Sequence, residues 1–171
     1  MSGSAARLSG VGRAAHAATQ ALPGAVIGTD DFRNDLIVRG GSPLENLFIV
    51  DNGNYRVLRV DSSTGIITTV AGTSYVCCSF SGEGASATSA VFYLPTRIAV
   101  DSTGNLYIAD TGNGRIRKVQ NGIITTIAGG GSGTGGGDAL SIGLSTPIAV
   151  AVDASGAVYV SEYDAARVRR I

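Results

Sequence analysis

Apolar and polar positions in this chain alternate over short stretches, and tight-turn residues separate these stretches. Residues 95–129 contain four of them: RIAVD (97–101), LYIAD (106–110), RIRKV (115–119) and IITTIAG (123–129). Alternation with a period of two, together with many β-branched and aromatic residues, predicts short β-strands. Asn121-Gly122 is a strong two-residue hairpin signal, because both positions tolerate positive φ. The pattern therefore predicts a four-stranded antiparallel sheet.

This pattern recurs along the chain. The stretch YIADTGNGRIRKV (107–119) matches FIVDNGNYRVLRV (48–60), 59 residues earlier, and more loosely YVSEYDAARVRRI (159–171), 52 residues later. The stretch GIITTVAG (65–72) also returns, as GIITTIAG (122–129). Repeated units of four antiparallel strands joined by glycine-rich crossovers are typical of a β-propeller. We therefore predict an all-β fold, a β-propeller segment of about three four-stranded antiparallel blades that forms an incomplete propeller or an open arc.

The repeats also predict the domain organisation. SGVGRAAHAATQALP (9–23) aligns with SGEGASATSAVFYLP (81–95) at a constant offset of 72 residues, which indicates a connector at the N-terminus. The longer first repeat requires an insertion. The predicted units are an inter-blade connector (1–22), a first blade (23–72) with the insertion at about 31–45, a crossover (73–94), a second blade (95–129), a glycine-rich crossover (130–146) and a third blade without its outer strand (147–171).

A family resemblance rests on the second repeat. Its pattern P-x-x-I-A-V-D-x-x-G-N-L-Y-I-A-D-x-x-N-x-R-I-R-K-V (95–119) resembles the NHL repeat, a propeller-forming unit, and the trailing GIITTIAG resembles the long-repeat variety of that family. The third repeat departs from the pattern, because Glu162 replaces the aspartate and Ala165 stands where the other repeats have asparagine. The resemblance implies a propeller fold. It leaves the function to particular residues, because such propellers host many activities.

Charge and composition narrow the range of partners. Thirteen Lys and Arg residues balance thirteen Asp and Glu residues. This balance argues against a nucleic-acid partner, although some relatives in the resembled family bind RNA. No apolar run approaches the roughly 20 residues that span a bilayer. Cys77 and Cys78 are adjacent and are interpreted as loop thiols, which leaves both their role and the compartment of the protein open.

Candidates for catalysis or metal binding are weak. His16 is the single histidine, and no metal-ligating residues lie near it at a suitable spacing. The glycine run GGGSGTGGGD (129–138) lacks the Gly-Lys-Ser/Thr ending of a phosphate-binding loop, and no G-x-S-x-G motif is present. We therefore predict no catalytic residue, no metal and no cofactor, and the sequence favours a protein without enzymatic activity.

Charged residues recur at equivalent positions of the three repeats. They pair Asp51 with Arg56, Asp110 with Arg115 and Glu162 with Arg167. A residue type that every blade repeats is needed by every blade, so we interpret these pairs as structural. An arginine can hold a carboxylate with two parallel hydrogen bonds. The sequence predicts one carboxylate–guanidinium contact per blade, bracing the turn between the second and third strands.

Residues that break the repeat are better candidates for function. In an up-and-down blade, the loop between the second and third strands lies on the same face as the crossovers. The candidates on this face are Tyr55, Tyr75, Phe80, Tyr163 and Asp164. Aromatic loop residues supply contact area at low entropic cost. We predict a non-catalytic scaffold that binds a protein or small ligand through this loop face. The alternative is a fragment of a propeller hydrolase or lyase whose catalytic residues lie in other blades.

Three blades do not complete a ring, because a closed propeller needs four to eight. Three explanations remain open. The chain is a fragment of a longer propeller, or it forms a head-to-tail homodimer with six blades, or it is a stable open arc.

Overall fold

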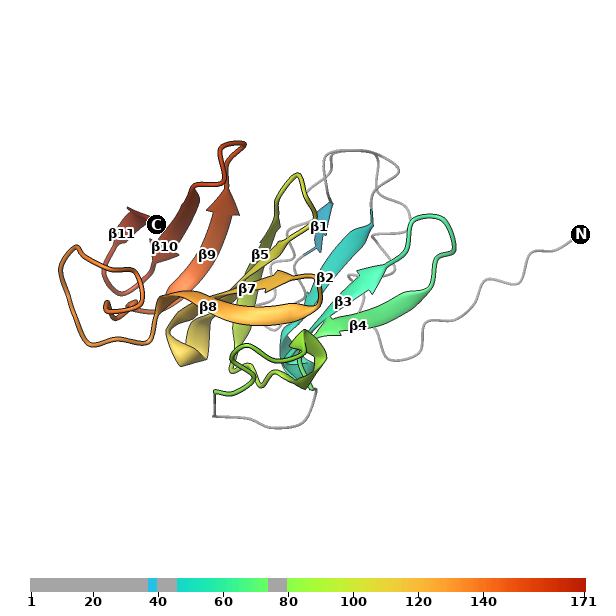
Figure 1. The fold of residues 1–171 in the computed structure, drawn as a ribbon, viewed down its shortest axis with the longest axis horizontal. Helices are drawn as coiled ribbons and strands as arrows, with labels where there is room; N and C mark the ends of the chain where they lie inside the picture. Colours follow the sequence, from blue (N-terminus) through green and yellow to red (C-terminus); the bar gives the residue numbers. More distant parts are fainter. Residues whose placement is uncertain (1–36, 40–45, 74–79) are drawn as a thin grey trace, which may run out of the picture.

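The computed structural model describes residues 37–39, 46–73 and 80–171. These residues form three antiparallel sheets that stand side by side in the order of the sequence (Figure 1). The first sheet contains β1 (Ile37–Arg39), β2 (Leu47–Asp51), β3 (Arg56–Val60) and β4 (Ile67–Ala71). The second contains β5 (Pro95–Val100), β6 (Leu106–Asp110), β7 (Arg115–Gln120) and β8 (Ile123–Gly129). The third contains β9 (Pro147–Val152), β10 (Val158–Glu162) and β11 (Arg167–Arg170).

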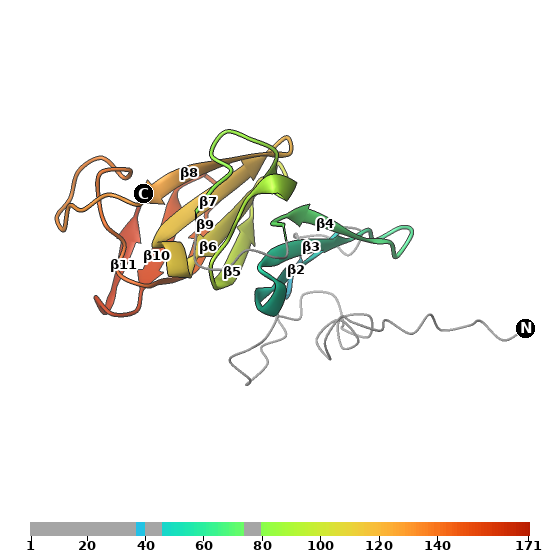
Figure 2. The same ribbon diagram turned by 90° about the horizontal axis from the view of Figure 1, so that it is seen from below.

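The strands within each sheet follow one another as neighbours, so each sheet is an up-and-down blade. One-turn 3-10 helices interrupt the loops: η1 (Asn52–Asn54), η2 (Ala87–Ser89) and η3 (Thr111–Asn113). Figure 2 shows the same row of sheets from below, with the third sheet at the end of the row. The prediction of an all-β segment of about three propeller blades is confirmed, and the arc does not close.

The first strand of the first sheet lies within the segment in which an insertion was predicted. Strand β1 pairs antiparallel with β2, with Ile37 opposite Ile49, as Ile98 stands opposite Ile108 in the second sheet. Residues 37–39 are therefore the blade's own first strand, although they fall inside the segment 31–45 that the repeat alignment assigned to an insertion. Pairing with β2 decides where this strand lies, and the bounds of the insertion stay a prediction.

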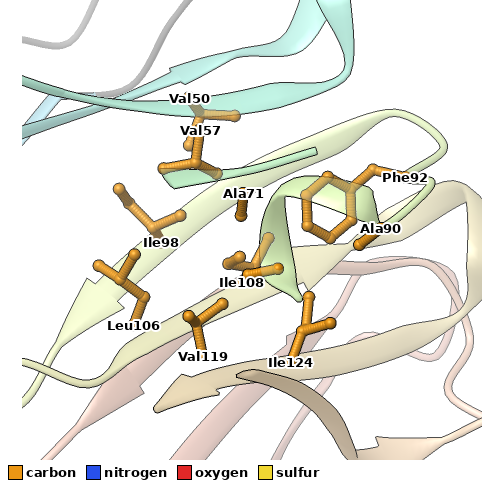
Figure 3. Close-up of a cluster of buried hydrophobic side chains, with 11 residues drawn as sticks. Val50, Val57, Ala71, Ala90, Phe92, Ile98, Leu106, Ile108, Val119 and Ile124 are labelled. Carbon is orange, nitrogen blue, oxygen red and sulfur yellow. The ribbon is translucent and has the colours of Figure 1, made fainter. Parts of the chain in front are cut away.

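Two separate hydrophobic clusters join the sheets, because alternate side chains of each strand point to opposite faces. Figure 3 shows the first cluster, between the first and second sheets. Its buried members are Val50, Val57 and Ala71 of the first sheet, Ile98, Leu106, Ile108, Val119 and Ile124 of the second, and Ala87, Ala90 and Phe92 of the segment before β5. The crossover thus contributes side chains to this contact between two neighbouring blades, which we call a joint.

The second cluster repeats this arrangement one blade further on. It joins Ala99, Tyr107, Ala109, Ile116 and Ala128 of the second sheet to Val150, Val158 and Val160 of the third, with Ile142 and Leu144 from the crossover. The two clusters share no residue. The second blade therefore uses one face for the preceding neighbour and the other face for the following one.

Glycine ends the last strand of both complete blades for a steric reason. Gly72 and Gly129 have φ values of +92° and +86°. A Cβ atom at Gly129 would lie 2.2 Å from the carbonyl oxygen of Gly114, and one at Gly72 would lie 2.4 Å from the carbonyl oxygen of Tyr55. Both the positive φ and the close approach of the neighbouring loop exclude a side chain here. This accounts for the repeated ending Ala-Gly in GIITT(V/I)AG.

Candidate functional site

The loops between the second and third strands meet the ends of the crossovers. The backbone N–H of Gly112 donates to the carbonyl oxygen of Tyr93 at 2.8 Å. In the next blade the N–H of Tyr163 donates to the carbonyl oxygen of Thr146 at 3.0 Å. These bonds place the loops and the crossover ends on one face, which we call the loop face.

Tyr55 closes the first of these loops in an unusual conformation. Its φ is +53°, and the equivalent residues Gly114 and Ala166 have φ values of +60° and +47°. A left-handed conformation is strained for a bulky residue. The ring of Tyr55 compensates by packing on the first hydrophobic cluster and by a tilted contact with Tyr93, whose ring centroid is 6.5 Å away. Half-buried in this way, Tyr55 contributes to the joint between the first two blades.

Tyr163 is largely exposed. It begins the loop of the third blade, and 69% of its surface is open to solvent. The adjacent Asp164 is also exposed, and its carboxylate accepts a hydrogen bond from the hydroxyl of Thr146. The two residues therefore form one exposed corner of the loop face that is tied to the end of the crossover.

Phe80 lies over two guanidinium groups. The Cζ atoms of Arg115 and Arg117 are 4.0 and 4.6 Å from the centroid of its ring, within the range of cation–π attraction. Tyr75 lies outside the described residues, as do Cys77, Cys78 and His16. The described candidates thus lie on the first blade, the first crossover and the third blade, and no hydrogen bond or ring contact joins two of them within residues 46–73 and 80–171. Their joint role in binding stays a prediction.

The predicted carboxylate–guanidinium pair occurs in two blades. Arg56 Nε lies 2.7 Å from Asp51 Oδ2, and Arg167 Nε lies 2.7 Å from Glu162 Oε1. In the second blade the prediction is wrong, because Arg115 Nη1 donates instead to the carbonyl oxygen of Asn113 at 2.8 Å.

Arg117 takes the place of Arg115 beside the carboxylate. Its Nη1 atom is 3.8 Å from Asp110 Oδ2, and its Nη2 atom is 3.6 Å from Glu83 Oε2. Asp110 itself accepts hydrogen bonds from the N–H of Tyr93 and from the side-chain amide of Asn113. The side chains of Asp110 and Arg117 are both buried completely, and none of the three guanidinium nitrogens of Arg117 has a hydrogen-bond partner among the described residues.

Burial has opposite effects on the two charges. It raises the pKa of Asp110 against the hydrogen bonds of Asn113 and Tyr93, and it lowers the pKa of Arg117 against the attraction of Asp110. Sequence reasoning missed Arg117, although the alternation in RIRKV puts it on the same face as Arg115. The first blade has Leu58 at this position, opposite Ile49.

The carboxylate of Glu162 accepts hydrogen bonds from two arginines of the third blade, Arg167 and Arg169. Burial alone would raise its pKa, but hydrogen bonds from Arg167, from the N–H of Ser145 and from Arg169 outweigh burial and lower the pKa to about 2. Arg167 contributes two of these bonds, through Nε at 2.7 Å and Nη2 at 3.1 Å. Glu162 therefore stabilises the folded state in its ionised form.

We expect the wild-type protein to lose stability as the pH falls, and we expect Glu162→Gln to abolish this part of the pH dependence. The folded pKa is depressed from 4.5 to about 2, so the contribution is complete above pH 4.5 and is lost as the pH falls toward 2. The shift corresponds to about 3 kcal/mol. Thermal unfolding should show wild type to be more stable than E162Q at pH 6, with the gap shrinking toward pH 2.5. A gap that stays constant would contradict this assignment. Asp110 is present in both wild type and E162Q, so its raised pKa does not affect the difference in stability between the two proteins.

A shallow depression lies beside this ion pair, at the end of the row of blades. Its volume is about 340 Å³, and its lining residues are Ile148, Ser161, Glu162, Tyr163, Ala166, Arg167 and Val168. Within the part of the chain that the structure describes, no three His, Cys, Asp or Glu side chains are grouped as a metal site would need. No helix among the same residues has the length and apolar character of a membrane span.

Solved structures with a similar fold support the blade architecture. An auxiliary nutrient binding protein of Bacteroides ovatus superposes with a TM-score of 0.63 at 22% identity, covering 84% of this chain and 38% of that chain. A second auxiliary nutrient binding protein, from Bacteroides thetaiotaomicron, gives a TM-score of 0.62 at 20% identity, covering 80% of this chain and 36% of that chain. At these identities the similarity concerns the fold alone.

Sequence comparison identifies the family. Teneurin-3 of Danio rerio is 37% identical over 94 residues, which cover 48% of this chain, and Teneurin-1 of Mus musculus is 37% identical over 84 residues, which cover 43%. The chain spans 3% of the length of each of these relatives. The family model described as the Teneurin NHL domain matches residues 42–136, more than half of the chain. On this match, the chain belongs to the Teneurin NHL domain family.

Proposed function

We propose that this propeller segment is a non-catalytic scaffold that binds a protein or a small ligand through the loop face. The observation that supports the proposal most is the environment of Tyr163. In the preceding blades the equivalent side chains are engaged inside the chain, since Asn52 donates to the carbonyl oxygen of Pro95 at 2.6 Å and Thr111 donates to that of Pro147 at 2.7 Å. Tyr163 instead presents a largely exposed ring.

The chemistry of this corner suits recognition. Tyrosine offers an apolar ring and a hydroxyl donor while it loses little conformational entropy on binding. Asp164 is the next residue along the chain, and its carboxylate adds an acceptor for a polar or basic group of the partner. A hydrogen bond to the end of the crossover already orients that carboxylate. The corner therefore favours a partner that combines an apolar patch with a hydrogen-bond donor.

The test compares Tyr163→Ala with Tyr159→Ala. Tyr159 is 36% exposed and lies on β10 rather than on the loop face, so it is a matched tyrosine control. Each protein is immobilised, exposed to an extract of the source cells, and the retained proteins and small molecules are quantified by mass spectrometry. We expect Y163A to lose at least 80% of a specifically retained species that Y159A keeps, on the order of a 1 kcal/mol or larger loss of binding free energy. Equal retention by wild type and Y163A would contradict the proposal.

A further inference from the structure

Three Asn-Gly dipeptides occur in the chain: Asn52-Gly53, Asn113-Gly114 and Asn121-Gly122. An asparagine before glycine is prone to lose its side-chain amide, because glycine has no side chain to hinder attack by its own backbone nitrogen on the amide carbon of the asparagine. The reaction requires both the asparagine amide and the glycine N–H to move into a reactive geometry. The hydrogen bonds of these two groups therefore decide which dipeptide reacts.

Hydrogen bonds hold two of these dipeptides. The side-chain amide of Asn52 donates to the carbonyl oxygen of the first residue of β5 at 2.6 Å. The side-chain amide of Asn113 donates to both carboxylate oxygens of Asp110, at 3.0 and 2.9 Å. The N–H of Gly114 also donates, to the carbonyl oxygen of Thr111 at 3.0 Å. The leaving amide is therefore fixed in both dipeptides, and the attacking nitrogen is fixed in the second of them.

The third dipeptide forms the tip of the β7–β8 hairpin, between the paired residues Gln120 and Ile123. Asn121 and Gly122 are both exposed, and their φ values of +52° and +76° suit a two-residue turn. Among the described residues, neither the side chain of Asn121 nor the N–H of Gly122 has a hydrogen-bond partner. Distortion of this tip therefore costs less free energy than distortion of the other two dipeptides.

The equivalent tip of the first blade lacks this chemistry. Its residues are Thr64 and Gly65, and threonine has no amide to lose. Asp61 accepts hydrogen bonds from the N–H and from the hydroxyl of Thr64, both at 3.0 Å. The reactive dipeptide therefore distinguishes the second blade from the first.

The tip of the second blade also holds the crossover. The carbonyl oxygen of Gly122 accepts a hydrogen bond from the N–H of Ala87 at 2.8 Å, and the N–H of Ile124 donates to the carbonyl oxygen of Ala85 at 3.0 Å. Ala87 and Ile124 are both buried within the first hydrophobic cluster. A change of backbone geometry at the tip therefore reaches the joint between the first and second blades.

We propose that Asn121 is a site of spontaneous deamidation, and that the isoaspartate formed there releases the crossover from the hairpin tip. The nitrogen of Gly122 attacks the side-chain amide carbon of Asn121 and forms a cyclic imide, while the amide nitrogen leaves as ammonia with the proton of the Gly122 N–H. Water then opens the imide at one of its two carbonyl carbons. Opening at the main-chain carbonyl gives isoaspartate, with one extra methylene group in the main chain and one new negative charge.

The extra main-chain atom does not fit a two-residue turn. Such a turn requires a defined backbone conformation at both positions, and the pairing of Gln120 with Ile123 fixes the strands on either side. Lengthening the turn therefore displaces the carbonyl of Gly122 from the N–H of Ala87. The tip lies at the opposite end of β7 from Arg115 and the loop face, so this inference does not depend on the proposed binding function.

The first measurement tests where the reaction occurs. The full chain is incubated in mildly alkaline buffer, and the three dipeptides are quantified by peptide mapping with mass spectrometry. We expect Asn121 to react at least tenfold faster than Asn52 or Asn113 in the folded protein. In urea the three rates should converge, because the dipeptide is the same at each position. Equal rates in the folded protein, or a slower reaction at Asn121, would overturn the proposed site.

The second measurement tests the consequence for the crossover. Hydrogen–deuterium exchange of the Ala87 N–H should be at least tenfold faster in the isoaspartate fraction of the incubated protein than in fresh protein. Asn121→Gly is the matched control, since Gly-Gly also forms this turn but has no amide to lose, and incubation should leave its exchange unchanged. Asn121→Asp adds the charge without the methylene group, so fresh N121D should exchange like wild type. Unchanged exchange in the isoaspartate fraction, or equal acceleration in fresh N121D, would overturn the release of the crossover by the extra methylene group.

Discussion

Replacing Asp110 by alanine is expected to lower the free energy of unfolding by about 3–5 kcal/mol, because it leaves a buried guanidinium without its nearest buried counter-charge. Asp110 is completely buried beside Arg117. The other carboxylate near Arg117 belongs to Glu83, whose side chain is 48% exposed. The substitution also removes the acceptor of the Tyr93 N–H. Urea denaturation at pH 7 measures the loss.

Two further variants separate the buried charge from a general effect of losing a carboxylate. Asp51 is the equivalent residue of the first blade, and its partner Arg56 is 27% exposed, so water can solvate that guanidinium when the carboxylate is gone. Asp51→Ala should therefore cost only about 1 kcal/mol. The double variant D110A/R117L should recover part of the loss, because it places leucine where the first blade has Leu58. Equal losses for D110A and D51A, or no recovery, would show that Arg117 does not need Asp110.

Replacing Phe92 by alanine is expected to cost a similar amount, about 3–5 kcal/mol, for a different reason. Phe92 is an uncharged side chain buried completely within the first cluster, between the first and second sheets (Figure 3). Its removal loses apolar burial and leaves a cavity in a joint that holds two blades together. Denaturant unfolding followed by circular dichroism gives the change in free energy.

Phe92→Leu is the matched control, because Leu144 performs the same role in the second joint. We expect F92L to cost about 1 kcal/mol, since leucine restores most of the buried surface. If F92A and F92L lose the same stability, the aromatic ring itself is required, and the equivalence of the two joints fails.

The repeats made most of the fold predictable from the sequence. The hairpin Asn121-Gly122, for example, was predicted from residue types and joins β7 to β8, where both residues have positive φ. The first strand of the first blade, Ile37–Arg39, was not predicted, because its residues are few and carry no repeat signature. Its position follows from pairing with β2, which is a contact between distant parts of the chain.

The charged pair of the second blade shows why equivalent positions need not have equivalent partners. Arg115 aligns with Arg56 and Arg167, yet Phe80 covers its guanidinium and Asp110 lies nearer to Arg117. An alignment of the repeats compares each residue with its equivalents in the other blades. The contact partner of that residue depends instead on the crossover that packs beside it. The same limit applies to the candidate site, since nothing in the repeat predicted that Tyr55 packs against Tyr93.

The two disjoint clusters have a consequence for how such a molecule can change over time. A globular domain with one shared core must adjust many side chains together when a segment is gained or lost. Here each joint is complete in itself, so a whole repeat can be duplicated or deleted while the remaining joints keep every side chain they use. The number of units is free to vary, and selection can act on the terminal units without disturbing those between them.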